Sequence, residues 1–130
     1  MALPQLDQTY LTDRKLAHEV SVEAGMICVL LPGFQLPPGY TQSRSDLLLR
    51  LSAGYPDVAP DMWWFDPPVL RSDGQQIACT QVTESHLGRT WQRWSRHLEP
   101  GQWRSGIDCI ESFLALIRSD LTRSAPGRAA

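Results

Sequence analysis

The sequence predicts an α+β fold, in which an antiparallel meander of four strands is followed by a C-terminal helix. Three observations indicate it. Residues 18–22 alternate polar and apolar side chains and residues 26–31 form an apolar run, which together favour a β-hairpin. Two further extended segments follow at 46–51 and 62–65. A stripe of apolar residues at helical spacing then lies near the C-terminus.

Proline and glycine mark the connections between these strands. Residues 32–39 are dense in both, so we expect a wide connection there that interrupts the ladder. Residues 55–60, here called the proline loop, are stiffened by Pro56 and Pro60. An Asp-Gly turn signal at 73–74 precedes the short, polar and irregular segment that carries Cys79.

The helix is expected to begin after Ser105, a good N-cap residue with Asp108 three positions later. Before it, residues 88–103 mix tryptophan with basic residues and show no clean periodicity, which predicts an aromatic loop with one helical turn. The apolar stripe of the helix consists of Ile107, Ile110, Leu114, Ile117 and Leu121.

The chain is long enough for one ordinary domain, which we place at residues 16–122. Residues 1–15 are predicted to form a short arm or one loose helical turn, and residues 123–130 a flexible tail.

Composition limits the classes of function. A net charge of −2 offers no basic field for phosphate backbones, so we expect no nucleic-acid partner. No run approaches the roughly 20 apolar residues that span a bilayer, and residues 1–5 lack the features of a signal peptide. We therefore expect a cytoplasmic protein with no membrane partner.

Cysteine and histidine spacing gives no sign of a bound metal. Cys28, Cys79 and Cys109 are widely spaced and odd in number, which indicates neither a disulfide framework nor a thiolate zinc site. His86 and His97 have no recognisable ligand spacing. We expect no metal and no cofactor.

Several motifs point to a known superfamily. The order of three strands, a Tyr-Pro-x-x-x-Pro loop, a further strand, an Asp-Gly turn, an Ile-x-Cys segment, an aromatic loop and a helix resembles the ubiquitin-conjugating enzyme superfamily and its non-catalytic RWD relatives. More narrowly, the motifs Leu36-Pro-Pro-Gly-Tyr40, Gly54-Tyr-Pro-Asp-x-x-Pro-Asp-Met62 and Gly88-Arg-Thr-Trp-Gln-Arg-Trp-Ser-Arg-His97 look like the bacterial branch called prokaryotic family E, which is associated with multi-ubiquitin-like modification operons.

The resemblance implies a ubiquitin-conjugating (UBC/RWD-like) fold in which the proline loop, with Tyr55, Pro56 and Pro60, is a flap packed on the meander. It also implies that Cys79 carries the C-terminus of a ubiquitin-like protein as a thioester. Two positions depart from the superfamily pattern. The His-Pro-Asn triplet is replaced by Asp-Pro-Pro at 66–68, and the interval from the turn to Cys79 is longer.

The residues themselves also favour Cys79 as the reactive thiol. A catalytic cysteine needs partial exposure and nearby positive charge, because the thiolate is the nucleophile. Cys79 has polar neighbours, whereas Cys28 and Cys109 lie in apolar surroundings where sulfur acts as a small hydrophobe.

Stabilising an oxyanion normally requires amide donors, and this chain contains no asparagine. We therefore predict that His97 acts as donor or base. The surrounding residues are predicted to bind a partner or support the oxyanion, because Trp and Arg are enriched at binding hot spots. The alternative is structural, with the indoles covering the core and the arginines pointing outward or paired to Asp57, Asp61 or Glu84. The residues concerned are Arg89, Trp91, Arg93, Trp94 and Arg96.

The predicted function is therefore that of a bacterial ubiquitin-conjugating-like transferase that passes a ubiquitin-like protein from an activating enzyme to an amine. The resemblance also makes antiviral defence possible. One alternative is a non-catalytic RWD-like module that docks the activating enzyme or the ubiquitin-like partner. Another is an oxyester-forming variant that uses Thr80 or Ser95, either of which would need His86 or His97 as a base.

Overall fold

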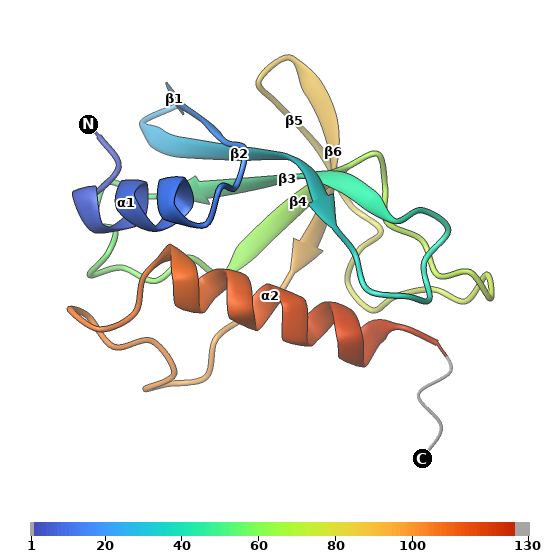
Figure 1. Cartoon of the computed structure of the whole chain (residues 1–130). Coiled ribbons are helices and arrows are strands. Elements are labelled where there is room, and N and C mark those ends of the chain that lie inside the picture. Colours follow the sequence, from blue (N-terminus) through green and yellow to red (C-terminus); the bar gives the residue numbers. More distant parts are fainter. Residues whose placement is uncertain (1, 127–130) are drawn as a thin grey trace.

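The computed structural model describes residues 2–126. In this part of the chain a six-stranded antiparallel sheet has the order β1-β2-β3-β4-β6-β5. Helix α2 lies along one face of the sheet, and the shorter α1 adjoins the same core (Figure 1). The elements are α1 (Gln5–Asp13), β1 (Glu19–Glu23), β2 (Met26–Gln35), β3 (Arg44–Leu51), β4 (Met62–Asp66), β5 (Thr83–His86), β6 (Arg89–Ser95) and α2 (Ile110–Ser124).

The α+β class, the antiparallel pairing and the C-terminal helix are confirmed, and the four predicted strands correspond to β1–β4. The wide connection expected at 32–39 is wrong in its first half, because β2 continues to Gln35. The register shifts between Leu31 and Phe34, and such a bulge accommodates Pro32 without breaking the sheet. The amide of Gly33 donates to Asp46 Oδ1 at 2.8 Å.

The expected arm or loose turn at the N-terminus is instead a nine-residue helix, α1. Few apolar residues mark it in the sequence, and its stability comes from tertiary contacts. Leu11 is fully buried in the main core, and Asp7 is 2% exposed. A helix this short is marginally stable on its own, and tertiary packing supplies the stability that its helix propensity does not.

The aromatic loop predicted at 88–103 is also wrong in its first half, because Arg89–Ser95 forms β6 between β4 and β5. Side chains alternate between the two faces of a strand, so Trp91 and Trp94 point in opposite directions. Trp94 enters the core under α2, while Trp91 joins a second cluster with Cys28, Leu48 and Trp64. We call these the inner and outer faces of the sheet.

Helix α2 begins later than expected, with Cys109 rather than Ser105 as its N-cap. Ile110, Leu114, Ile117 and Leu121 are fully buried, as the predicted stripe requires, but Ile107 precedes the helix and is 62% exposed. Ser105 instead donates a hydrogen bond to Asp57 in the proline loop. Residues 127–130 of the predicted tail lie outside the described residues.

Candidate functional site

Cys79 lies on an irregular segment between β4 and β5, as predicted. Residues 77–81, here called the Cys79 turn, fold back so that Ile77 and Thr80 are buried while Cys79 is exposed. The Thr80 hydroxyl donates to the Ile77 carbonyl at 2.9 Å, and the side-chain amide of Gln81, through Nε2, donates to the same oxygen at 2.8 Å. These bonds fix the base of the turn and leave the thiol at its tip.

Two hydrogen bonds tie the Cys79 turn to the end of β6. The Cys79 carbonyl accepts from the Ser95 amide at 3.0 Å, and the Ala78 carbonyl accepts from Arg96 Nη1 at 2.8 Å. Cys79 has φ +59°, in the left-handed region that non-glycine residues seldom occupy. The surrounding contacts therefore have to hold this conformation.

Arg96 is the cationic residue that bonds to the Cys79 turn, next to the candidate thiol. Its Nε donates to Asp120 Oδ2 of α2 at 2.8 Å, and its guanidinium carbon lies 4.9 Å from the Trp94 ring centroid. Its side chain is only 19% exposed. The guanidinium is thus fixed between the Cys79 turn, an indole and the last turns of α2.

The other two cysteines are in different environments. Cys28 is fully buried on the outer face, and Cys109 caps the N-terminus of α2 and is half-buried. The Cys109 sulfur accepts from the backbone of Ser112, which is a structural use of the thiol. Cys79 is therefore the exposed thiol of the three.

His97 follows the end of β6, two residues after Ser95. Its side chain is 76% exposed, and Nδ1 lies 3.5 Å from Asp61 Oδ2. It lines a hollow of about 560 Å³ against α2 together with Leu98, Leu116 and Ser119. The pocket beside the Cys79 turn is a different one, and neither His97 nor Cys79 is among the residues that line it.

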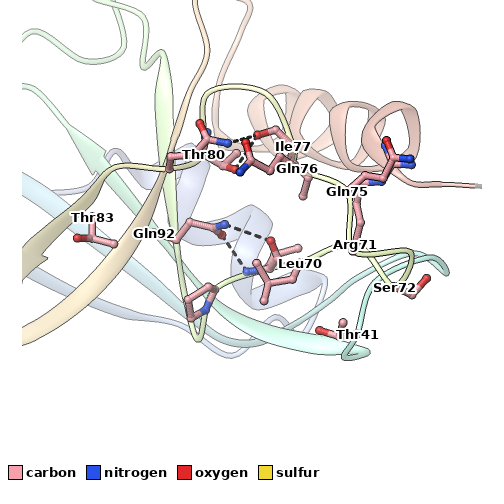
Figure 2. A pocket seen from close by; sticks show the side chains of 14 residues that line it. Thr41, Leu70, Arg71, Ser72, Gln75, Gln76, Ile77, Thr80, Thr83 and Gln92 are labelled. Carbon is pink, nitrogen blue, oxygen red and sulfur yellow. Dashed lines mark hydrogen bonds between the residues drawn. The ribbon is translucent and has the colours of Figure 1, made fainter.

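That second pocket, also of about 560 Å³, lies between the Cys79 turn and the segment after β4. Figure 2 shows Gln92 of β6 reaching from its wall to the backbone just before Leu70. Gln92 Oε1 accepts from the Val69 amide at 2.8 Å, and Nε2 donates to the Val69 carbonyl at 3.1 Å. The other residues that line this pocket include Thr41, Arg71, Gln75, Gln76, Thr80 and Thr83.

Trp91 and Trp94 were predicted to bind a partner, which would require exposed indole rings, and the structure contradicts such exposure. Trp91 and Trp94 are both fully buried, since β6 places one in each core. A docking protein therefore cannot contact either indole ring in this fold. Arg89 and Arg93 share the outer face with Trp91, whereas Arg96 projects from the inner side to α2.

The arginines on the outer face are engaged in ion pairs. Arg89 bridges Asp46 and Asp66, each at 2.9 Å, and its guanidinium carbon lies 4.4 Å from the Trp91 ring centroid. Arg93 donates to Glu84 at 2.7 Å. Both arginines are therefore paired to acids, as the structural alternative predicts, but only Arg93 uses one of the predicted partners, Glu84, whereas the partners of Arg89 are Asp46 and Asp66.

Glu84 is the centre of a polar cluster on the outer face. It accepts from Trp64 Nε1 at 2.9 Å and from Arg93, and His86 Nε2 lies 3.0 Å from its Oε1. Burial alone would raise the pKa of Glu84, but the hydrogen bonds from His86, Trp64 and Arg93 together hold it below its ordinary value. The carboxylate is therefore fixed in its charged form.

The proline loop is fixed through its first residue. Tyr55 is 8% exposed, and its hydroxyl donates to Asp7 Oδ2 at 2.8 Å. Burial, with the adjacent Asp7 carboxylate, raises the pKa of Tyr55 well above its ordinary value. The other Asp7 oxygen accepts from the Ile110 amide at 3.0 Å, so one carboxylate joins α1, the loop and α2.

The rest of the proline loop packs beneath a residue that the sequence did not assign to it. Trp103 Nε1 donates to the Pro56 carbonyl at 2.8 Å, and the Trp103 and Tyr55 rings lie 6.1 Å apart. Pro60 is buried. Of the residues predicted to form a flap, Tyr55 and Pro56 therefore contact Trp103.

Sequence reasoning missed Asp120 and Gln92, both buried polar residues that organise the surroundings of the Cys79 turn. A signal for Asp120 was present, because it lies next to Leu121 and three residues after Ile117 in the apolar stripe. A charge at such a position indicates a buried partner. The identity of that partner depends on how β6 meets α2.

Comparison with known proteins identifies the family of this chain. No curated protein and no solved structure matches the chain. Among residues 2–126, no helix has both the length and the apolar character needed to cross a bilayer. The family model described as Prokaryotic E2 family E matches residues 3–124, which confirms the resemblance in the sequence motifs. The chain therefore belongs to prokaryotic E2 family E, a family whose name indicates a ubiquitin-conjugating-like role.

Proposed function

We propose that this protein carries the C-terminus of a ubiquitin-like protein as a thioester on Cys79 and transfers it to an amine. Family membership supports the conjugating-type role, and with it a ubiquitin-like protein and an activating enzyme as partners. The observation that carries the assignment to Cys79 is its exposure at the tip of a braced turn, while Cys28 and Cys109 have structural positions.

The proposed chemistry has two steps. In the first, the Cys79 thiolate attacks the carbonyl carbon of a thioester held on the activating enzyme. A new carbon–sulfur bond forms and the activating enzyme's thiolate leaves. In the second step, an acceptor amine attacks the Cys79 thioester, an amide bond forms, the Cys79 thiolate leaves and the amine loses a proton to a base.

His97 is the proposed base and donor for the second step. Asp61 next to Nδ1 can orient the imidazole, which leaves Nε2 for the proton of the amine. The ring is 76% exposed and follows the strand end that anchors the Cys79 turn. Arg96 is proposed to support the developing oxyanion or the turn itself.

The oxyester alternative is weaker on these contacts. Thr80 is 7% exposed and its hydroxyl donates to the Ile77 carbonyl, so it is held as a structural group. The Ser95 hydroxyl accepts from Arg93 Nε at 2.9 Å on the outer side of β6. Neither hydroxyl has an imidazole among its hydrogen-bond partners in the described residues.

The test is incubation with the cognate ubiquitin-like protein, its activating enzyme and ATP, followed by non-reducing electrophoresis. We expect a thiol-sensitive adduct in the wild type and in Cys109→Ala, and none in Cys79→Ala. His97→Ala should form the adduct but discharge it to amine more slowly, by about 10²-fold.

Two results would overturn the assignment. An adduct that survives Cys79→Ala would move the carrier elsewhere, and one that resists thiols but is cleaved by hydroxylamine would identify an oxyester. If no adduct forms under any condition, the protein acts as a binding module of the same fold.

A further inference from the structure

Asp120 is a carboxylate in a place where charge is costly. It lies on the side of α2 that faces the sheet, and its side chain is 10% exposed. A buried charge persists in a stable fold only when partners compensate it. Asp120 Oδ2 accepts from Arg96 Nε at 2.8 Å, Oδ1 accepts from the Ser124 hydroxyl at 3.1 Å, and the exposed Arg123 lies 3.8 Å away.

The bond to Arg96 sets the direction of the whole guanidinium. Because this group is planar and rigid, fixing Nε on Asp120 also fixes where Nη1 points. Nη1 donates to the Ala78 carbonyl at 2.8 Å, immediately before Cys79. The Arg96 guanidinium therefore links the Asp120 carboxylate to the backbone of the Cys79 turn.

The Cys79 turn needs such a restraint. A left-handed φ at a residue with a Cβ persists only where neighbouring contacts impose it, and two bonds from the end of β6 do so here. One comes from the Ser95 amide, which is part of the strand. The other comes from Arg96, whose orientation depends on Asp120.

We infer that Asp120 is a positioning residue for the Cys79 thiol, acting through Arg96 to hold the Cys79 turn against β6. This inference rests on the proposed function, because it assumes that Cys79 is the carrier. Asp120 touches neither substrate nor thiol in this scheme. Its effect is to keep the Ala78 carbonyl, and so the tip of the turn, in one orientation.

The test compares Asp120→Asn with Arg123→Gln. Arg123 contacts the same carboxylate from the same helix, but it is 69% exposed and makes no bond to the Cys79 turn. Backbone amide exchange is measured by NMR at two residues of β6: Ser95, which donates to the Cys79 carbonyl, and Arg93, which donates to the Val82 carbonyl just before β5. We expect Ser95 exchange to accelerate about tenfold in Asp120→Asn, with Arg93 exchange unchanged. Arg123→Gln should alter neither amide.

Two further measurements follow the thiol itself. Alkylation of Cys79 by iodoacetamide, resolved by mass spectrometry, should change in rate in Asp120→Asn but not in Arg123→Gln. Thioester formation should slow by about tenfold, because a small displacement of a nucleophile has a large kinetic effect. Arg96→Gln should give the same loss, and the double variant no further loss, since both act through one contact.

Unchanged Ser95 exchange in folded Asp120→Asn would overturn the inference. Equal acceleration at Ser95 and Arg93 would also overturn it, because that pattern indicates general loosening of β6. If Asp120→Asn does not fold, Arg96→Lys replaces it. Lysine keeps the charge but lacks the planar guanidinium with its several donors. Faster amide exchange at Ser95, with Arg93 exchange unchanged, is therefore expected in this variant too.

The outcomes for the two proposals are separable. If wild type forms no adduct at all, the proposed function fails. Exchange and alkylation then still decide whether Asp120 and Arg96 hold the Cys79 turn.

Discussion

The two faces of the sheet are stabilised by different kinds of contact. On the inner face, aromatic rings pack against one another and against α2, with Trp63 stacked on Trp94 at 6.1 Å and edge-on to Phe113 at 5.8 Å. On the outer face a smaller apolar cluster around Trp64 and Trp91 is bordered by ion pairs. The inner face depends on burial and the outer face also on charge.

This difference predicts how each face responds to change. Apolar burial is insensitive to the protonation of side chains, so damage to the inner face should be large and independent of pH. Ion pairs at partly exposed positions contribute little each and depend on pH and salt. The candidate site lies at the end of β6, where Ser95 belongs to the outer side and Arg96 reaches α2.

The largest effect is expected for Ile110→Asp on the inner face. Ile110 is fully buried, and an unpaired carboxylate there should unfold the domain by removing several kcal/mol of stability, about 3–5. Ile107→Asp is the matched control, because this residue of the same predicted stripe is 62% exposed. Thermal melts that rank the two the other way would refute the core described here.

A smaller but clear effect is expected for Asp7→Ala. The substitution leaves the Tyr55 hydroxyl and the Ile110 amide without their acceptor, at a cost of about 1–3 kcal/mol. Asp13→Ala, at the exposed end of α1, should stay within about 0.5 kcal/mol. Denaturant titrations of both variants measure the difference, and equal midpoints would show that Asp7 does not join the three elements.

The outer face should show the pH dependence. The pKa of Glu84 is lowered in the folded protein, so its contribution is present above the unfolded value of about 4.5 and is lost as the pH falls through the folded value. Glu84→Gln should therefore flatten the acid limb of stability below that pH, by less than about 1 kcal/mol. Melts from pH 3 to 7 with exposed Glu19→Gln as control test this, and parallel curves would contradict it.

The smallest effect on stability is expected for Cys79→Ala. Cys79 is exposed at the tip of its turn, so the free energy of unfolding should change by no more than about 0.5 kcal/mol. Comparison of its melting temperature with that of the wild type measures this. A large destabilisation would mean that the thiol has a structural role, which would weaken its assignment as carrier.

Much of the sheet was predictable because its signals are local. The alternation at β1, the apolar runs of β2 to β4 and the stripe of α2 each follow from neighbouring residues. β6 was missed because Arg89–Ser95 shows no alternation of polar and apolar residues. The three-residue spacing of Trp91 and Trp94 resembled a helical turn, whereas each indole in fact faces a different core.

The candidate site was predictable only in part. The polar surroundings of Cys79 in the sequence indicated exposure, and the structure agrees. The contacts of Arg96 with Asp120 and with the Ala78 carbonyl join segments that are distant in sequence, so no local pattern contains them. Similarly, α1 carries little signal of its own and depends on partners such as Tyr55.

The shared carboxylate of Asp7 has a practical consequence for anyone trimming this protein. A shortened version starting at residue 16 would keep every strand and α2, yet it would remove the oxygen that receives the first amide of that helix. It would also remove Leu3 and Leu11 from the main core. The smallest version that keeps both the helix end and the proline loop in place therefore has to include the first helix.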